Sequence, residues 1–545
     1  MSGVSTAPVL QGAPISPDVS DPSEATTVCH VVDAAESERV AAGEIDGEAA
    51  SVPAEHGPTG SSTRSDPNWP RWFLIIGAIL GVVYVATMPV SRPLDEPHHL
   101  RRVATLDNGV IVPPAFGETT VDYRVDGCVE ALIRRAGANF SALLRGTPQS
   151  LGTADRWRLR VTNPACGPDA VLFGGGSISG AEVNSPVPYL PAMIGYAVGR
   201  PLGGALGAVY GARLAQLAAY LAICWWALRR LPWGRPFAAA VALVPTSLGG
   251  AAGVSADPVT LALTLAVVAV TLGTIDDVER RRRAPGGRAL VGLSALFVLL
   301  GLCKPAAAPL VLLALIVPTA PFRSFRRRAI WVTATIGAVA ATGGAWALGV
   351  SSKVHVTTTP HVDSTVTAAW LNHHLWTLPG TLWRTLTIPE ASRYLLGGLV
   401  TPLGIDVLEI PVVVTLFGLA VLVVARLVDP LPRRFAHLGS PPARRPVRAS
   451  RPQLRLERVT AAVIAGCGII AVTYGIYVAS NRPDSSVISG IQGRYFLPYL
   501  LLLLVGTRPT PAGRARPRFQ VGLVVGLLLL HVYWLGRLYV WWKLV

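Results

Sequence analysis

Stretches of about 20 apolar residues recur along this chain from about residue 72 onward. A helix of roughly 20 residues crosses the ~30 Å hydrocarbon core of a bilayer and satisfies its backbone hydrogen bonds internally. We count about eleven such stretches. Their centres lie near residues 81, 216, 244, 267, 296, 312, 340, 418, 469, 502 and 529. The sequence therefore predicts an all-α, polytopic membrane protein with about 11 transmembrane helices.

Composition agrees with a lipid-solvated chain, since 51% of the residues are hydrophobic, 15% are charged and the mean hydropathy is +0.45. The net charge of +16 by itself suggests nucleic acid. The basic residues, however, form short clusters between apolar stretches, which is typical of cytoplasmic loops. We therefore expect the lipid bilayer as a partner and no nucleic acid.

The basic clusters fix a predicted orientation, because the alternation of spans places all of them on one side. They lie at Arg229–Arg235, Arg280–Arg288, Arg323–Arg328, Arg426–Arg458 and Arg508–Arg518. This orientation puts the N-terminus in the cytoplasm and the C-terminus outside. The preference for Arg over Lys, with much Ala, Gly and Pro, indicates a high-GC, actinobacterial-like source and hence a bacterial cytoplasmic (inner) membrane.

The chain divides into a polar tail and a membrane domain. Residues 1–70 are predicted to be a disordered cytoplasmic tail, and residues 71–545 a multi-span domain. Within that domain, 91–205 and 350–408 are large outer loops, and 426–458 is a basic cytoplasmic loop. We expect function in the outer loops.

An acidic, histidine-rich segment, residues 95–99 (DEPHH), directly follows the first apolar stretch. Charge at a membrane surface commonly has a functional reason. In a helix, Asp95, His98, His99 and Arg102 share one face, so His99 would orient the Asp95 carboxylate or shuttle its proton. The same face offers Asp95 and His99 to a divalent cation, and Mg²⁺ or Mn²⁺ is therefore a candidate cofactor.

Six short segments along the chain carry a family likeness. They are 93–99 (PLDEPHH), 184–190 (NSPVPYL), 255–258 (SADP), 304–305 (KP), 403–406 (LGID) and 492–498 (QGRYFLP). In order and location they resemble the predicted bacterial membrane proteins of domain-of-unknown-function family 2142, over about residues 72 to 510. The last segment is the most specific.

That family in turn resembles the GT-C class of integral membrane glycosyltransferases. The resemblance implies a GT-C-like fold with a large extracytoplasmic first loop, helices on the membrane surface and a polyprenyl-phosphate sugar donor. The implied activity is transfer of a sugar from that lipid to a cell-envelope glycan or lipid acceptor, as in polysaccharide biosynthesis, on the extracytoplasmic face.

Two interpretations of the acidic segment remain open. In the first, Asp95 or Glu96 is the general base that accepts the proton of the acceptor hydroxyl, with His99 in support. In the second, Asp95 caps the following helix and the histidines merely occupy the wet interface. The cation site is likewise open, because relatives of this class differ in their use of a metal.

A leaving lipid phosphate needs cationic partners close to the membrane surface. Arg494 is the first candidate, flanked by Gln492 and Tyr495 before an apolar stretch, since a guanidinium grips two phosphate oxygens. Lys304, at the outer end of a span, is predicted to be a second contact. A salt bridge between Lys304 and Asp257 is the competing interpretation.

Other side chains of the outer segments are predicted to border the same cavity. Residues 184–200 are expected to form a surface helix there, and a twelfth span is the competing interpretation. The predicted lining residues are His98, Arg102, Asn184, Tyr189, Asp257 and Asp406.

Two cysteines, Cys128 and Cys166, both lie in the first outer loop, which is an oxidising location, and are predicted to form a disulfide. Two unpaired thiols are the alternative.

Other functional classes find little support. The chain has no Walker-type GxxxxGK[ST], no dinucleotide-binding fingerprint and no HExxH. The alternatives to a glycosyltransferase are a lipid-linked glycan flippase or export component, which should show interrupted helices, and a noncatalytic envelope-assembly protein.

Overall fold

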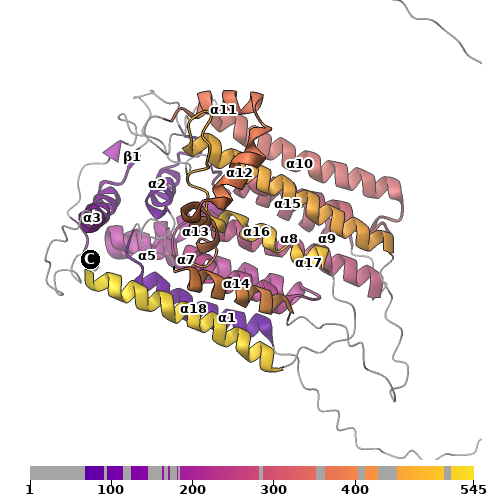
Figure 1. The fold of residues 1–545 in the computed structure, drawn as a ribbon, viewed down its shortest axis with the longest axis horizontal. Helices are drawn as coiled ribbons and strands as arrows, with labels where there is room; N and C mark the ends of the chain where they lie inside the picture. Colours follow the sequence, from indigo (N-terminus) through magenta and orange to yellow (C-terminus); the bar gives the residue numbers. More distant parts are fainter. Residues whose placement is uncertain are drawn as a thin grey trace, which may run out of the picture. The chain divides into compact units, whose positions relative to one another are not determined.

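The computed structural model describes an α-helical protein. It covers residues 68–90, 95–113, 124–144, 162–164, 170–171, 181, 184–280, 286–351, 362–402, 411–427, 451–507 and 517–544. Its strands within these ranges are two residues each, Arg124–Val125 (β1) and Ala170–Val171 (β2), paired antiparallel. The predicted all-α class is confirmed (Figure 1). The predicted tail lies outside the described residues up to residue 67.

The helices follow the sequence in this order. The first half of the chain gives α1 (Trp69–Thr87), α2 (Glu96–Asp107), α3 (Gly127–Leu144), η1 (Val187–Tyr189), α5 (Leu190–Arg230), α6 (Arg235–Leu243), α7 (Pro245–Ala252) and α8 (Asp257–Arg280). The second half gives α9 (Gly287–Cys303), η2 (Pro305–Ile316), η3 (Ala320–Phe322), α10 (Phe325–Ser351), α11 (Ser364–His373), α12 (Thr377–Thr387), α13 (Pro389–Gly397), α14 (Val412–Leu427), α15 (Arg451–Ser480), η5 (Gly493–Phe496), α16 (Leu497–Leu500), α17 (Leu503–Gly506) and α18 (Pro517–Leu544).

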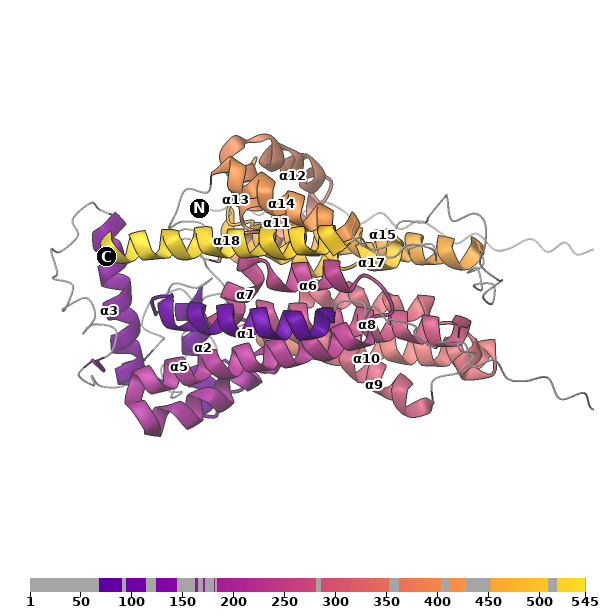
Figure 2. The same cartoon turned by 90° about the horizontal axis from the view of Figure 1, so that it is seen from below.

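Six described helices, α1, α5, α8, α10, α15 and α18, are long and apolar enough to cross a membrane. Shorter apolar segments are α9, η2, α14 and η5 through α17. Nine of the eleven predicted centres fall inside helices, while 244 and 502 fall at breaks, between α6 and α7 and between α16 and α17. Figures 1 and 2 show α1, α5, α8 and α18 running along a common direction. The polytopic architecture is confirmed, and the count of eleven crossings stays a prediction.

The α6–α7 pair is one apolar segment broken at Val244, because the proline that begins α7 has no N–H to donate. A break leaves carbonyls without helical partners, which is tolerated at membrane depth only where protein groups replace them. The hydroxyl of Tyr220 donates to the Ala242 carbonyl at 2.7 Å. His531 Nε2 lies 2.7 Å from the Leu243 carbonyl oxygen. Side chains of helices α5 and α18 therefore provide hydrogen-bond partners for the carbonyls at the break.

Element η2 is a 3₁₀-helix of 12 residues that contains Pro305 and Pro309. A 3₁₀-helix rises ~2.0 Å per residue, against ~1.5 Å in an α-helix, so its 12 residues extend roughly 24 Å. Its last carbonyls have side-chain donors, since Gln453 Nε2 donates to Ile316 at 3.1 Å. The segment is therefore longer than an α-helix of 12 residues, and its length approaches the ~30 Å thickness of a bilayer core.

Helix α5 contains a sharp reversal at Gly203 and Gly204, so its two halves pack against each other. A methyl group at Gly195 would collide with the backbone of Gly211, and close approach of this kind requires glycine. Most of the predicted surface helix, 184–200, is helical: it consists of η1 and the first arm of α5, which leads through the reversal into the next predicted span. Its position at the membrane surface stays a prediction. The extent of the first outer loop, 91–205, likewise stays a prediction.

Helix α2, whose first turn carries the acidic segment, makes buried apolar contacts with neighbouring helices. Leu100 and Val103 pack in a cluster with Val129 of α3 and Val209 of α5. Arg101 adds a hydrogen bond from Nε to Glu130 of α3, at 2.9 Å. These contacts fix α2 against α3 and α5.

Candidate functional site

A cavity of about 340 Å³ lies among α7, α8, η2, α15 and the η5–α16 segment. Most of its wall is apolar and is formed by α8, η2, α15 and the η5–α16 segment. Its polar lining is Asn184, Thr246, Ser247, Asp257, Thr260, Lys304, Arg494 and Tyr495. A concave, mostly apolar site with a few convergent polar groups is typical of small-molecule binding. This arrangement suits a ligand with an apolar body and an anionic head.

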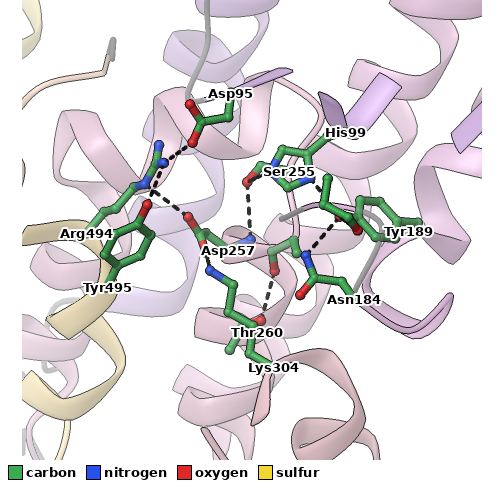
Figure 3. A network of polar contacts seen from close by, with 12 residues as sticks. Asp95, His99, Asn184, Tyr189, Ser255, Asp257, Thr260, Lys304, Arg494 and Tyr495 are labelled. Atoms are coloured by element: carbon green, nitrogen blue, oxygen red, sulfur yellow. Dashed lines mark hydrogen bonds and ion pairs between the residues drawn. The ribbon is translucent and has the colours of Figure 1, made fainter. Parts of the chain in front are cut away.

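Four charged side chains form a continuous network, and three of them, Asp257, Lys304 and Arg494, line this cavity (Figure 3). Arg494 makes an ion pair with Asp95, and its Nε lies 3.3 Å from Asp257 Oδ2. Lys304 pairs with the other carboxylate oxygen of Asp257. Both cations lie 5.0 Å from the centroid of the Tyr495 ring. Two carboxylates therefore balance two cations. Asp257 comes from α8 and Arg494 from η5, while Lys304 directly precedes η2 and Asp95 directly precedes α2.

Asp95 occupies the N-cap position of α2, but its side chain makes no capping hydrogen bond. Its backbone has φ 65°, a left-handed conformation that Asp and Asn adopt more readily than most residues. The side chain, 54% exposed, turns instead toward Arg494. Burial raises the pKa of Asp95, but the Arg494 guanidinium and neighbouring histidines outweigh it and lower the pKa below its ordinary value. The carboxylate is therefore ionised and partly accessible.

Glu96 faces the opposite way, into a fully buried ion pair with Arg213 of α5. Arg213 Nε donates to Glu96 Oε1 at 2.7 Å and a terminal nitrogen donates to Oε2 at 2.5 Å. The guanidinium also donates to the carbonyls of Met88 (2.8 Å) and Pro89 (2.9 Å), just after α1. The Val254 backbone N–H donates to Glu96 Oε1 as well, at 3.1 Å. Glu96 thus joins α1, α2, α5 and the turn before α8, and both its oxygens are engaged.

His99 lies between two hydroxyl groups. Its Nδ1 is 2.7 Å from the Tyr189 hydroxyl and its Nε2 is 3.5 Å from Ser255 Oγ. The Tyr189 hydroxyl also accepts from Asn184 Nδ2 at 3.2 Å. Burial, opposed in part by Asp95 and Asp257, lowers the pKa of His99 to about 4. His99 is therefore neutral near pH 7 and holds the η1 segment against the turn before α8.

The lowered pKa of His99 predicts a specific loss of stability in acid. An ordinary histidine titrates near pH 6.5 in the unfolded chain, and His99 near 4 in the folded one. Between these values the unfolded state binds the extra proton. The free energy of unfolding therefore decreases by up to ~1.4 kcal/mol for each unit by which the pH is lowered. Thermal unfolding from pH 7 to pH 4 should show a smaller fall for His99→Gln than for the wild type. Parallel curves would contradict this assignment.

The two residues predicted to hold a divalent cation, Asp95 and His99, have different partners. The histidine nitrogens face hydroxyls, and the Asp95 carboxylate faces Arg494. Within the described ranges, no three His, Cys, Asp or Glu side chains are grouped as a cation site. A divalent cation at Asp95 and His99 stays a prediction.

The remaining predicted residues fall into three groups. Asn184 lines the cavity. Arg102 is buried and donates to carbonyls, including that of Ile111 at 2.7 Å, and so supports the loop after α2. Gln492 precedes η5 without lining the cavity, and His98 is half-buried on α2.

Two further predicted residues, Asp406 and Cys166, lie outside the described residues. Cys128 is disulfide-bonded. Because Cys166 lies outside the described residues, the pairing of these two cysteines stays a prediction.

Two polar residues of α5 belong to this site and were missed by the sequence reasoning. Arg213 holds Glu96, and the Gln216 side-chain amide donates to the Ser255 carbonyl. Both lie within the apolar stretch predicted to be centred near residue 216. A charged residue inside an apolar span was the available signal, because such residues usually pair within the protein.

Comparison with protein families matches residues 78–503 to the family described as Predicted membrane protein (DUF2142). The match spans well over half of the 545 residues. No curated protein and no solved structure matches the chain.

Proposed function

This chain belongs to the DUF2142 family of predicted membrane proteins, and from that premise we propose that it is a GT-C-like glycosyltransferase. It would transfer a sugar from a polyprenyl-phosphate-type lipid to a cell-envelope glycan or lipid acceptor, on the extracytoplasmic face of the membrane. The observation that carries the proposal is the cavity, whose lining is mostly apolar and includes the two cations Arg494 and Lys304.

The two cations are the proposed contacts of the donor phosphate. Arg494 is 4% exposed and Lys304 is 25% exposed, so both have little water to compete with an anion. Charge builds on the phosphate oxygen as the bond to the sugar breaks, and fixed cations stabilise such charge most in a dry site. The apolar wall would receive the first isoprenoid units of the lipid.

Asp95 is the proposed general base. The acceptor hydroxyl oxygen attacks the anomeric carbon, its proton passes to the Asp95 carboxylate, and the sugar–phosphate bond breaks to release the lipid phosphate. Glu96 has no free oxygen for this task, so we assign it to positioning α2.

The test is an assay of the purified protein in liposomes that contain polyprenyl-phosphate sugars of several kinds. We expect release of the lipid phosphate with at least one donor and acceptor pair. A series of divalent cations, with chelator as control, shows whether a cation enters with the donor. If every donor stays intact while the lipids remain accessible, the proposal is wrong.

Filling the cavity should block the donor. Gly475 of α15 lines the cavity, and a Cβ at this position would meet no atom within 4 Å. Gly475→Leu should therefore enter the cavity without disturbing packing and weaken donor binding at least tenfold, as judged by binding of polyprenyl phosphate. Gly466→Leu is the matched control, because Gly466 lies on the same helix, has equally open space and does not line the cavity. Equal affinity in the two variants would contradict this location of the lipid.

A second candidate, a lipid-linked glycan flippase, is favoured by the break at Val244. Interrupted helices next to a binding site are typical of transporters, and Thr246 and Ser247, just after the break, line the cavity. Transbilayer movement of the donor without sugar transfer, in the same liposomes, would support this function instead.

A further inference from the structure

We propose that Asp95 occupies, in the resting protein, the place on Arg494 that the donor phosphate takes, so that donor binding itself releases the base. This inference rests on the proposed donor site and describes its regulation. It makes the protein bind donor before the Asp95 carboxylate becomes available to the acceptor.

Exposure differs sharply between the two partners of this ion pair. Arg494 is 4% exposed, whereas the Asp95 side chain is 54% exposed. A buried guanidinium needs an anionic partner, because leaving it unpaired is costly. A half-exposed carboxylate regains water easily when it leaves. The pair is therefore suited to exchange of its anion, with Arg494 fixed and Asp95 replaceable.

The other carboxylate on Arg494 is held more firmly. Asp257 is 19% exposed and pairs with Lys304 as well as with Arg494. It also lies at the first position of α8, a long helix that is largely buried. Asp95 has no second cation among these contacts, and its side chain does not cap α2. An incoming anion therefore displaces Asp95 before Asp257.

Replacement of Asp95 by phosphate also keeps an anion paired with Arg494. With Asp95, Asp257, Lys304 and Arg494 paired, the network is neutral. A phosphate that replaces Asp95 keeps a negative charge on Arg494, and it can accept two hydrogen bonds from the guanidinium. The released carboxylate moves away from the cation that lowers its pKa, and so becomes a stronger base.

Equilibrium binding tests the exchange without any turnover. Polyprenyl phosphate that carries no sugar is titrated into the purified protein in lipid nanodiscs. Removing the internal competitor should tighten binding, so Asp95→Asn should lower the Kd on the order of tenfold relative to the wild type. Asp95→Gly serves as a second variant, because glycine accepts the left-handed backbone at this position.

Two controls separate this effect from a general change of charge. Asp107→Asn removes the same charge from the other end of α2, where Asp107 lies 3.8 Å from Arg200, and should leave the Kd within twofold. In an Arg494→Gln background the gain from Asp95→Asn should vanish, as expected for two coupled residues.

The results of these titrations distinguish failure of the exchange from failure of the proposed function. An unchanged or weaker affinity in both Asp95 variants overturns the exchange, while the proposed glycosyltransferase stands if the wild type binds and turns over donor. Tightening that persists without Arg494 also overturns it. Absence of binding by the wild type and every variant overturns the proposed function together with this inference.

Discussion

Asp95→Asn should lower the turnover number by ~10²–10⁴-fold, the range that loss of a general base typically produces. Asparagine has the shape of aspartate and tolerates the left-handed backbone at this position, so the variant should fold and insert normally. It cannot accept a proton. Release of lipid phosphate at saturating donor measures the effect, and the loss should fall on kcat rather than on the affinity for donor.

Asp107→Asn is again the matched control, since it lies on the same helix and contacts no member of the charged network that the structure describes. It should retain nearly full turnover. Full activity of Asp95→Asn, with wild-type dependence on donor, would remove Asp95 from the chemistry. Donor binding without release of lipid phosphate, in the variant and the wild type alike, would instead favour the flippase.

Glu96→Gln should destabilise the folded protein by about 3–5 kcal/mol, the range observed when one member of a buried ion pair is removed. Both side chains of the Glu96–Arg213 pair are fully buried. The variant leaves the Arg213 guanidinium charged with neutral partners, which include the Val85, Met88 and Pro89 carbonyls. Thermal or denaturant unfolding in detergent measures the effect, and Arg213→Gln should behave alike.

The double variant Glu96→Gln, Arg213→Gln is the decisive comparison for this pair. It buries no net charge, so it should be less destabilised than the sum of the two single variants. Asp107→Asn, which loosens a longer and more exposed ion pair, should change stability by less than about 1 kcal/mol. Additive single variants would show that the two side chains act independently.

Hydrophobic patterning predicted the architecture because a bilayer imposes length and apolarity on every span. It placed centres near 244 and 502 without indicating that the helices break there. Such breaks depend on donors from distant segments, such as Tyr220 and His531, and no local pattern reports them. The reversal at Gly203 was hidden for the same reason, since it depends on glycine contacts between the two arms of α5.

The sequence indicated which residues belong to the candidate site better than it indicated which of them contact each other. Asp95, Arg494 and Lys304 were singled out because charge near apolar spans needs a partner, and the structure places all three in one network with Asp257. The sequence could not show that Glu96 and Asp95, adjacent in the chain, face different partners. Helical spacing put His99 on the face of Asp95, but the left-handed backbone at residue 95 turns that carboxylate toward Arg494 instead.

The contact between α18 and the broken segment has a consequence for biogenesis. The Leu243 carbonyl is synthesised and inserted 288 residues before His531, whose ring nitrogen approaches it in the folded protein. The same ring lies 2.9 Å from the Tyr84 hydroxyl of α1, one of the first groups to enter the bilayer. Until α18 arrives, water or another chain group has to satisfy that carbonyl within the membrane. Insertion by the translocon and completion of the fold are thus separate events, and α18 closes a structure that earlier helices leave open.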